Sequence, residues 1–268
     1  MLTTSFVTGS LTWADLGTPD IERANGFYGG VFGWTAEGDS EKFGGYVTYR
    51  SDGQSVAGGM QVPEKEAPPA WSLYFCAPDV EAAVKAVEQA GGTVALEPID
   101  VGDLGRMAVC TDPTGAGFSV WQAGTMPGFE AVQRPGSLCW AELYTSDVTA
   151  ASEFYSTALG LQAYEVPFPG GSYTTLYPQG ADPEAMFGGV VPKEVDALEA
   201  RSPSHWLPYF EVADCDAAAA QARELGGAVD MEPTDLQDVG RIAKLADPFG
   251  ARFAVMRPAP RQADTQEG

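Results

Sequence analysis

Histidine is almost absent from this chain of 268 residues, in which His205 is the only one. Zinc centres and non-haem iron centres usually take at least two imidazole ligands. The sequence therefore excludes a histidine-rich metal centre built within one chain. We expect no resident metal and no other cofactor.

Basic residues are also scarce. Fifteen Lys and Arg stand against 37 Asp and Glu, which gives a formal net charge of −22 and a pI near 4.1. A chain with this charge repels phosphate backbones and anionic lipid surfaces. Nucleic acid and membrane are therefore not expected as partners, and a small-molecule ligand or substrate is.

Paired cysteines, a leader segment and long apolar runs are lacking as well. The first residues, MLTTSFVTGS, have neither the basic region nor the apolar region of a secretory signal, and no apolar run is long enough to span a bilayer. A cytoplasmic location is the expectation. Four widely spaced cysteines without a CxxC pair are expected to be reduced core residues: Cys76, Cys110, Cys139 and Cys215.

The chain does contain enough apolar material for a folded core, with 44% hydrophobic and 19% charged residues. An internal repeat divides it into two similar halves. Residues 10–34 match 137–161, and residues 97–120 match 232–255. We predict two domains, 1–124 and 136–260, joined by a Gly- and Pro-containing linker at 125–135 and followed by a disordered tail at 261–268.

Strand and helix patterns alternate within each half. Residues 10–16 alternate like a strand, and Asp20 begins an amphipathic helix. Asp52-Gly53 indicates a hairpin, and a second strand and helix follow from Trp71. Each half is thus predicted to contain two βαβββ units, an α+β fold with curled mixed sheets around a cleft. The first helix of each half is expected on the convex side, with Phe27, Tyr28 and Val31, or Phe154, Tyr155 and Ala158, buried.

Several short motifs recur in both halves: W-x-[DE]-L-x-T-x-D followed by Phe-Tyr, then D-[VC]-[ED]-A-A, G-R-x-A and D-P-x-G-A-x-F-x-V. Together they resemble the vicinal oxygen chelate superfamily, which includes glyoxalase I, extradiol dioxygenases, and fosfomycin and bleomycin resistance proteins. More narrowly, the chain resembles tandem actinobacterial glyoxalase-like proteins often labelled as hydroxylases. Since one fold hosts many chemistries, the resemblance implies the fold more strongly than the activity.

The resemblance also has implications for assembly and for metal binding. In single-copy relatives two chains pair to complete the clefts, so this chain is expected to be a monomer with an internal pseudo-dimer, or a homodimer. The first metal ligand of metal-dependent relatives falls at Trp13 and Trp140. Other ligands would fall near Ser72, Ser119, Leu207 and Ala254, and because none of these is an ordinary ligand, no metal-binding residue is predicted.

Strand alternation places Trp13 and Asp15 on one face of a strand, and Trp140 and Glu142 repeat this arrangement. An indole beside a carboxylate suits a flat or cationic organic molecule. The alternative is a core tryptophan and a structural acid. As catalytic candidates we take Asp15 and Glu142 as general bases, with a tyrosine or His205 as the acid.

Further repeated aromatic residues are candidates to line the two clefts, and core positions are the alternative for each of them. Tyrosine hydroxyls in the middle hairpins can orient a polar ligand. The candidates are Tyr46, Tyr49, Trp71, Tyr74 and Trp121 in the first half, and Tyr173, Tyr177, Trp206 and Tyr209 in the second.

Three functions follow as hypotheses. The first is a metal-free member of the superfamily that binds a small organic molecule, such as a natural product or antibiotic, in an acidic, aromatic cleft. The second is a cofactor-independent lyase, isomerase or polyketide-tailoring enzyme that uses one of the two carboxylates as a base. The third is a glyoxalase or dioxygenase with a carboxylate-based divalent-metal site.

Overall fold

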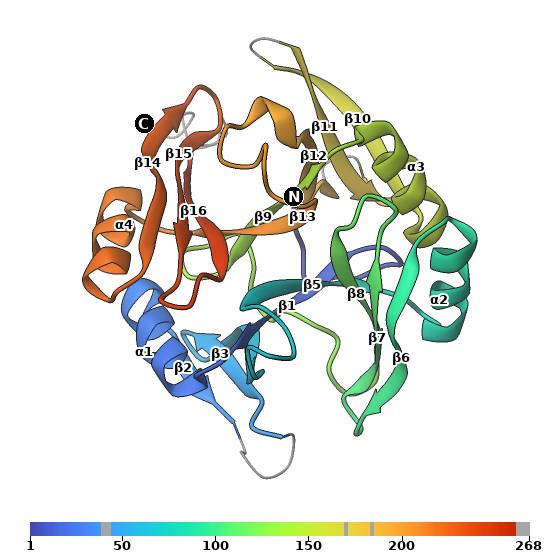
Figure 1. Ribbon diagram of the computed structural model, residues 1–268, viewed down its shortest axis with the longest axis horizontal. Coiled ribbons are helices and arrows are strands. Elements are labelled where there is room, and N and C mark those ends of the chain that lie inside the picture. Colours follow the sequence, from blue (N-terminus) through green and yellow to red (C-terminus); the bar gives the residue numbers. More distant parts are fainter. Residues whose placement is uncertain (39–43, 169–170, 183–184, 261–268) are drawn as a thin grey trace, which may run out of the picture.

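The chain folds into two eight-stranded mixed sheets, each built from one repeat, and the predicted α+β class is confirmed (Figure 1). The computed structural model describes residues 1–38, 44–168, 171–182 and 185–260, so the predicted tail at 261–268 lies outside the described residues. The first repeat comprises β1 (Leu11–Thr18), α1 (Ile21–Phe32), β2 (Thr35–Glu37), β3 (Val47–Ser51), β4 (Gln54–Gln61), β5 (Ala70–Cys76), α2 (Val80–Gln89), β6 (Thr93–Val101), β7 (Gly105–Thr111) and β8 (Gly117–Ala123).

Among the described residues, the second repeat has the same order of α-helices and strands, with a short 3-10 helix between β12 and β13. It comprises β9 (Leu138–Thr145), α3 (Val148–Leu159), β10 (Leu161–Phe168), β11 (Gly171–Pro178), β12 (Gly188–Pro192), the 3-10 helix η2 (Lys193–Val195), β13 (His205–Glu211), α4 (Cys215–Glu224), β14 (Ala228–Leu236), β15 (Gly240–Ala246) and β16 (Arg252–Pro258).

The strand order confirms the paired βαβββ units. It is β2-β3-β4-β1-β5-β8-β7-β6 in the first sheet and β10-β11-β12-β9-β13-β16-β15-β14 in the second. Within the first sheet, β1 pairs parallel to β4, β5 pairs parallel to β8, and β1 and β5 meet antiparallel at the centre. Residues on β1 or β9 can therefore contact side chains from both units of their sheet.

Each of the four α-helices begins after an aspartate whose carboxylate accepts a hydrogen bond from a backbone N–H three residues further on. Gly33 and Gly160 end α1 and α3 in the left-handed conformation, which glycine adopts without strain. The four N-terminal residues are Asp20, Asp79, Asp147 and Asp214.

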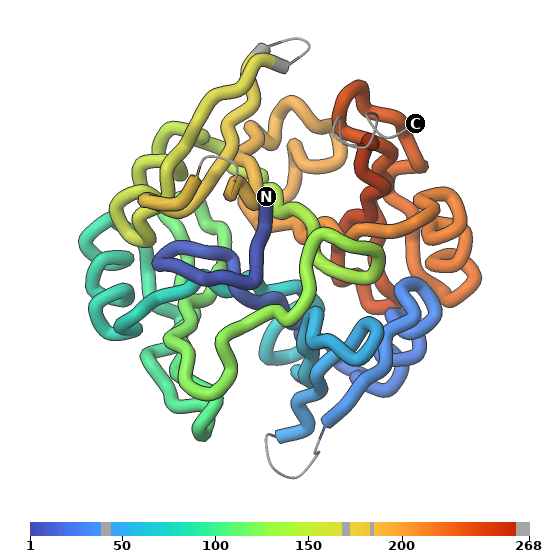
Figure 2. Tube along the Cα trace, turned by 180° about the vertical axis from the view of Figure 1, so that it is seen from behind, coloured from blue at the N-terminus to red at the C-terminus, as the bar shows by residue number. Residues whose placement is uncertain are grey.

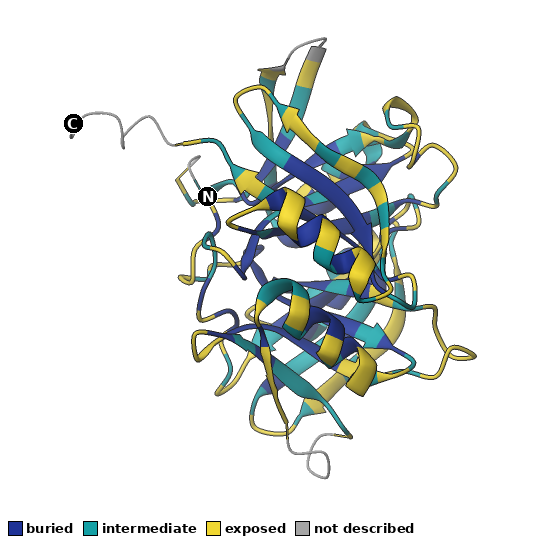
Figure 3. Ribbon diagram, turned by 90° about the vertical axis from the view of Figure 1, so that its left-hand side faces the viewer, coloured by how far each residue is buried: buried dark blue, intermediate teal, exposed yellow. Residues whose placement is uncertain are grey.

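The first helix of each repeat packs against the other repeat. α1 lies beside α4, and α2 lies beside α3 (Figure 1), and Figure 3 shows α4 and α1 from the side with their exposed faces outward. Phe27 and Phe154 are buried as predicted, and their rings lie 6.2 Å from Phe253 and 5.8 Å from Phe118, respectively, across the boundary between repeats. Val31 is only half-buried. The two tandem repeats thus form an internal pseudo-dimer.

Polar contacts join the repeats at equivalent points. The Tyr28 hydroxyl donates to Asp247 at 3.3 Å and accepts from the Trp71 indole at 3.1 Å. In the other direction, Tyr155 bonds to Asp112 and accepts from the Trp206 indole at 2.8 Å. Each tyrosine is fully buried, so these hydrogen bonds satisfy polar groups that water cannot reach.

Three predicted cleft residues lie in this aromatic core instead. Trp71 and Trp206 face the helices and bond to Tyr28 and Tyr155, and Tyr49 packs with its ring 5.2 Å from Trp34. All three are buried. These residues pack in the core because strand alternation places them on the helix side of their sheets.

The segment between the repeats runs past the N-terminal end of β1 (Figure 2). Phe129 donates its backbone N–H to Thr12 and packs its ring 5.4 Å from Trp13. The carbonyl of Met126 accepts from the Trp121 indole at 2.9 Å. These contacts tie residues 126–129 to β1 and β8.

All four cysteines are free, as predicted, and three of them are buried. Among the described residues, the structure contains no helix with the length and apolar character that crossing a membrane requires.

Replacement of Phe27 by alanine is expected to lower the free energy of unfolding by about 3–5 kcal/mol, because the ring fills the core between the repeats. Urea unfolding followed by circular dichroism measures the change. Glu22→Ala, at an exposed position in the first turn of the same helix, is the control and should change the stability by no more than about 1 kcal/mol, the usual effect of a charge at a helix terminus. Equal effects of the two substitutions would contradict the packing described here.

Candidate functional site

The inner face of each sheet, defined here as the face opposite the helices, carries the predicted pair of an indole and a carboxylate. Asp15 is paired with Gly58 of β4 and with Ser72 of β5, and Glu142 is paired with Gly189 of β12 and Leu207 of β13. Both acids therefore lie at the centre of their sheets, where the two βαβββ units meet.

The first cluster consists of Trp13, Asp15, Tyr46 and Tyr74. Tyr74 donates its hydroxyl to Asp15 at 2.8 Å, and Tyr46 also bonds to this carboxylate. The indole of Trp13 donates to the Tyr46 hydroxyl at 2.8 Å. Trp13, Asp15 and Tyr74 are only 3%, 7% and 6% exposed, so this cluster is almost sealed from solvent.

Burial changes the acidity of the first cluster. Removal of Asp15 from water raises its pKa from 3.8 to about 6, although the hydrogen bonds from Tyr74 and Tyr46 oppose the shift. Burial, and then the nearby charge of Asp15, raise the pKa values of Tyr46 and Tyr74 well above their usual value. The two phenols therefore stay protonated and act as donors to the carboxyl group.

The second cluster consists of Trp140, Glu142, Tyr144, Tyr173 and Tyr209. Three tyrosine hydroxyls donate to Glu142: Tyr144 at 2.6 Å, Tyr173 at 2.8 Å and Tyr209 at 2.5 Å. The indole of Trp140 donates to the Tyr173 hydroxyl at 3.0 Å. Trp140, Glu142 and Tyr173 are half-buried, so this cluster is less completely enclosed than the first.

A glycine in each sheet makes room for the tyrosine of the middle hairpin. A Cβ atom on Gly58 would overlap the hydroxyl of Tyr46, and a Cβ atom on Gly189 would overlap the hydroxyl of Tyr173. The sequence pattern Gly-Gly in β4 and β12 therefore marks the close approach of a side chain over the strand.

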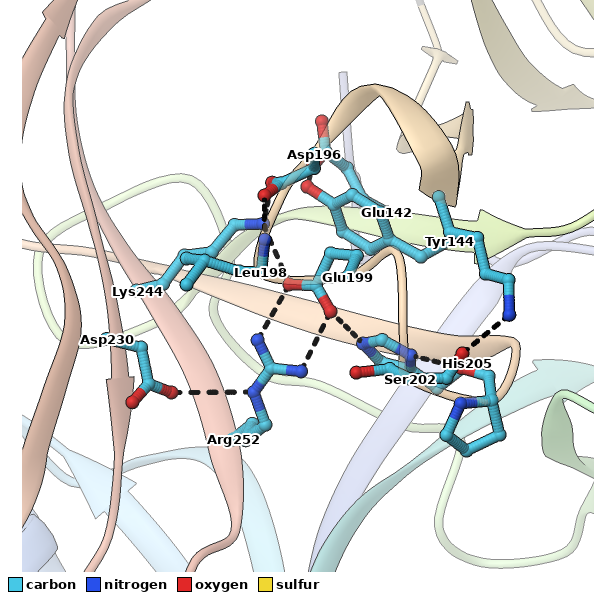
Figure 4. Close-up of polar contacts among 12 residues, drawn as sticks. Glu142, Tyr144, Asp196, Leu198, Glu199, Ser202, His205, Asp230, Lys244 and Arg252 are labelled. Atoms are coloured by element: carbon cyan, nitrogen blue, oxygen red, sulfur yellow. Dashed lines mark hydrogen bonds and ion pairs between the residues drawn. The ribbon is translucent and has the colours of Figure 1, made fainter.

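The strap, residues 193–204, connects β12 to β13 and lies against the second sheet (Figure 1). Figure 4 shows that Glu199 of the strap accepts hydrogen bonds from Lys244 at 2.9 Å and from both terminal nitrogens of Arg252 at 2.7 and 2.8 Å. Asp196 accepts from Lys244 at 2.6 Å, and Asp230 of β14 lies 3.5 Å from Arg252. The strap is thus held by a network of buried and partly buried charges.

The second cluster and this charged network are contiguous. The Lys244 ammonium lies 4.2 Å from the centroid of the Tyr144 ring, and the same tyrosine donates to Glu142. Burial alone would raise the pKa of Glu199, but the hydrogen bonds from Arg252 and Lys244 outweigh it and lower the pKa to about 2. Glu199 is therefore an anion at neutral pH.

His205 lies at the edge of the second cluster and not at Glu142. Its ring stacks on Tyr144 with centroids 5.6 Å apart, and its Nδ1 lies 2.9 Å from the carbonyl of Pro203. Its Nε2 lies 3.4 Å from Glu199. Burial lowers the pKa of His205 despite these contacts, so the ring is neutral at neutral pH.

The remaining predicted lining residues lie on the inner faces but outside both clusters. Trp121 is buried beside the segment that links the repeats. Tyr177 is half-buried and lies four residues after Tyr173 on β11, so the two side chains share a face of the strand.

Five residues of the second site were not predicted. They differ from the first repeat, which has Gly17, Val109 and Gly117 at the positions of Tyr144, Lys244 and Arg252. Two features of the sequence could have indicated these residues: the positions at which the second repeat differs from the first, and the longer segment before β13. The residues are Tyr144, Asp196, Glu199, Lys244 and Arg252.

Comparisons with known proteins agree with this fold. The model of the Glyoxalase/Bleomycin resistance protein/Dioxygenase superfamily matches residues 10–120 and 137–255. The chain belongs to this superfamily. It is 41% identical over 268 residues to the anthracycline biosynthesis protein DnrV of Streptomyces peucetius, covering 94% of each chain. It is 38% identical over 259 residues to CFP32 of Mycobacterium bovis, which carries a glyoxylase name, covering 95% of this chain and 97% of that one.

Solved structures of the superfamily share the fold. The 2,3-dioxygenase LapB from Pseudomonas sp. KL28 superposes with a TM-score of 0.64 at 15% identity, covering 97% of this chain and 96% of that chain. The Mn(II)-bound glyoxalase from Novosphingobium aromaticivorans gives a TM-score of 0.64 at 16% identity, covering 94% and 83%. At these identities the likeness concerns the fold alone.

The inner faces do not fit the divalent metal that many superfamily members hold. Among the described residues, no group of three or more His, Cys, Asp or Glu side chains is placed to hold a metal ion. At the centre of each sheet, the oxygens of Asp15 and Glu142 are engaged by tyrosine hydroxyls instead. A protonated phenol is a poor ligand for such ions, so these tyrosines do not complete a metal site.

Ionisation of the buried Asp15 makes the folded protein less stable as the pH rises, and Asp15→Asn is expected to abolish this pH dependence. Because the folded-state pKa of about 6 exceeds the ordinary value of 3.8, the folded protein binds the proton more tightly, and stability falls as pH rises through this window. Relative to the wild type, the variant should therefore gain about 2 kcal/mol between about pH 4.5 and about pH 7.5 in urea unfolding. The same relative stability at both pH values would contradict the buried carboxyl group.

Gly189→Ala is expected to lower the free energy of unfolding by about 1–3 kcal/mol, because the methyl group displaces Tyr173 from Glu142. Gly117→Ala is the matched control, since no atom lies within 4 Å of the added Cβ at this strand position. Thermal and urea unfolding of both variants measure the difference. A loss no larger than that of the control would show that Tyr173 is not held over the strand.

Proposed function

We propose that the chain binds a small, flat organic molecule at the second cluster, without a resident metal ion. The observation that carries this proposal is the carboxylate of Glu142, held by three tyrosine hydroxyls beside the half-buried indole of Trp140. A fixed carboxylate accepts hydrogen bonds from hydroxyl or amine groups, and an aromatic surface stacks on a planar ring system.

The surroundings of the second cluster support an apolar, aromatic ligand. Apolar side chains from four strands pack together on this inner face, and two methionines adjoin them, which suits irregular apolar shapes. The buried members are Cys139, Tyr144, Leu207, Tyr209, Ile242 and Ala254, with Met231 and Met256 packed against them.

The name of one relative supports an aromatic ligand. DnrV is named for anthracycline biosynthesis, and anthracyclines are polycyclic aromatic natural products that carry hydroxyl groups. Such a molecule offers both the planar rings and the donors that the second cluster would accept. We therefore place the ligand among hydroxylated aromatic natural products.

Titration with 1,4-dihydroxyanthraquinone tests the proposal through the quenching of tryptophan fluorescence. Glu142→Gln should weaken binding about tenfold, which corresponds to the loss of one charge-assisted hydrogen bond of about 1.4 kcal/mol. Asp15→Asn, the equivalent change in the first repeat, is the matched control and should leave the dissociation constant unchanged. Trp140→Ala should remove part of the quenching.

The proposal fails if the probe does not bind, or if its affinity ignores Glu142. Elemental analysis of the purified protein tests separately whether the ligand binds without a metal ion. Stoichiometric metal that a chelator removes, with loss of probe binding, would favour a divalent-metal glyoxalase or dioxygenase instead.

The second candidate function is a cofactor-independent lyase, isomerase or tailoring enzyme that uses the first cluster. The observation that favours it is the raised pKa of Asp15, about 6, because a general base works best when its pKa lies near the working pH. In this case Asp15→Asn should lower turnover by about 10²–10⁴-fold. Binding without turnover would leave the first proposal in place.

A further inference from the structure

Side chains from three strands of the second sheet converge on one carboxylate. Arg252 of β16 binds Glu199 with two parallel hydrogen bonds, Lys244 of β15 donates a third, and His205 of β13 lies 3.4 Å away. The donors stand on a rigid sheet, whereas the carboxylate belongs to the strap, of which only η2 is helical. A planar guanidinium with an ammonium beside it is a common arrangement for carboxylate recognition.

These donors occur in one repeat only. Val109, Gly117 and Ala70 occupy the positions of Lys244, Arg252 and His205 in the first repeat. The fold of a repeat therefore does not require them. The repeat that has these donors also has the longer strap, and the donors lie beside the second cluster.

The position of the donors relates them to the proposed ligand. Lys244 lies over the Tyr144 ring, and the hydroxyl of that ring reaches Glu142. A planar molecule that contacts Glu142 and Tyr144 would extend toward Arg252 and Lys244. The carboxylate of Glu199 lies between Lys244 and Arg252 (Figure 4).

Anchoring the strap does not by itself explain this choice of residues. Glu199 is fully buried and Lys244 is 2% exposed, and the desolvation of such charges offsets much of their attraction. Well-packed apolar residues of similar size often hold two segments together as well as a buried ion pair does. Arg252 and Lys244 have a clear purpose if the Glu199 carboxylate can be replaced by a carboxylate of a ligand, since the two cations then stay paired in both states.

We propose that Arg252 and Lys244 form a subsite for a carboxylate on the ligand, and that Glu199 fills this subsite when no ligand is bound. This inference rests on the proposed function and specifies its ligand further, as an aromatic molecule that carries a carboxylate. Binding exchanges one carboxylate for another and releases the strap, while Asp230 keeps its place beside Arg252.

Two matched probes test the subsite: anthraquinone-2-carboxylate and the neutral anthraquinone-2-carboxamide, titrated by tryptophan quenching. Glu199→Gln, which removes the competing charge, should tighten binding of the carboxylate about tenfold and leave the carboxamide unchanged. Arg252→Gln should weaken binding of the carboxylate about tenfold and again leave the carboxamide unchanged. Arg241→Gln is the control, because Arg241 binds Asp216 with two hydrogen bonds on the same sheet but away from the strap.

The opposite signs of the two variants distinguish a subsite from a simple anchor. If Glu199 and Arg252 only hold the strap, both substitutions loosen it and shift the affinity for both probes in the same direction, which would overturn the inference. Binding of both probes with equal affinity in every variant would also overturn it. If neither probe shows a dependence on Glu142, the proposed function itself fails.

Trypsin provides a readout that does not depend on fluorescence. Because the strap contains Lys193 and Arg201, its release should speed cleavage after these residues when the carboxylated probe is added. The carboxamide should not have this effect. Protection of the strap by the carboxylated probe would show that Glu199 stays in place, contrary to the inference.

Discussion

The aromatic core shared by the two repeats is the constraint on which the rest of the structure depends. Phe27 of α1 packs on Phe253, and Phe154 of α3 packs on Phe118, so the first helix of each repeat buries its apolar face against the other repeat. Burial of one large aromatic side chain is worth about 1.5–3 kcal/mol, and here it is available only when both copies are present. Duplication within one chain supplies that partner without a second subunit.

This arrangement leaves the inner faces of both sheets free to diverge. Because the helices and the boundary between repeats occupy one face of each sheet, Asp15 and Glu142 lie on the opposite faces, although Trp13 and Tyr74 beside Asp15 are themselves buried. The first inner face closes over a carboxyl group whose pKa rises to about 6. The second keeps a half-buried Glu142 and adds the charged contacts of the strap, so the two copies share a framework but differ in charge and accessibility.

The repeat in the sequence was enough to predict the paired units, because the motifs fix strand, helix and turn positions through local chemistry. The pairing of Trp13 with Asp15 on one face also followed from strand alternation alone. Tyr49, Trp71 and Trp206 were harder to place, since an aromatic residue on a strand suits a core as well as a cleft. Only tertiary contacts show that these three face the helices.

The charged network of the second repeat escaped prediction for a different reason. Lys244 and Arg252 are not among the motif residues that recur in both repeats. Their partners Asp196 and Glu199 come from a segment without helix or strand periodicity. A residue-by-residue comparison of the two copies would have isolated them, because Val109 and Gly117 show what the fold alone needs there. Burying a cation costs free energy unless an anion accompanies it, so the lysine on β15 and the acids on the strap form a single unit within one repeat.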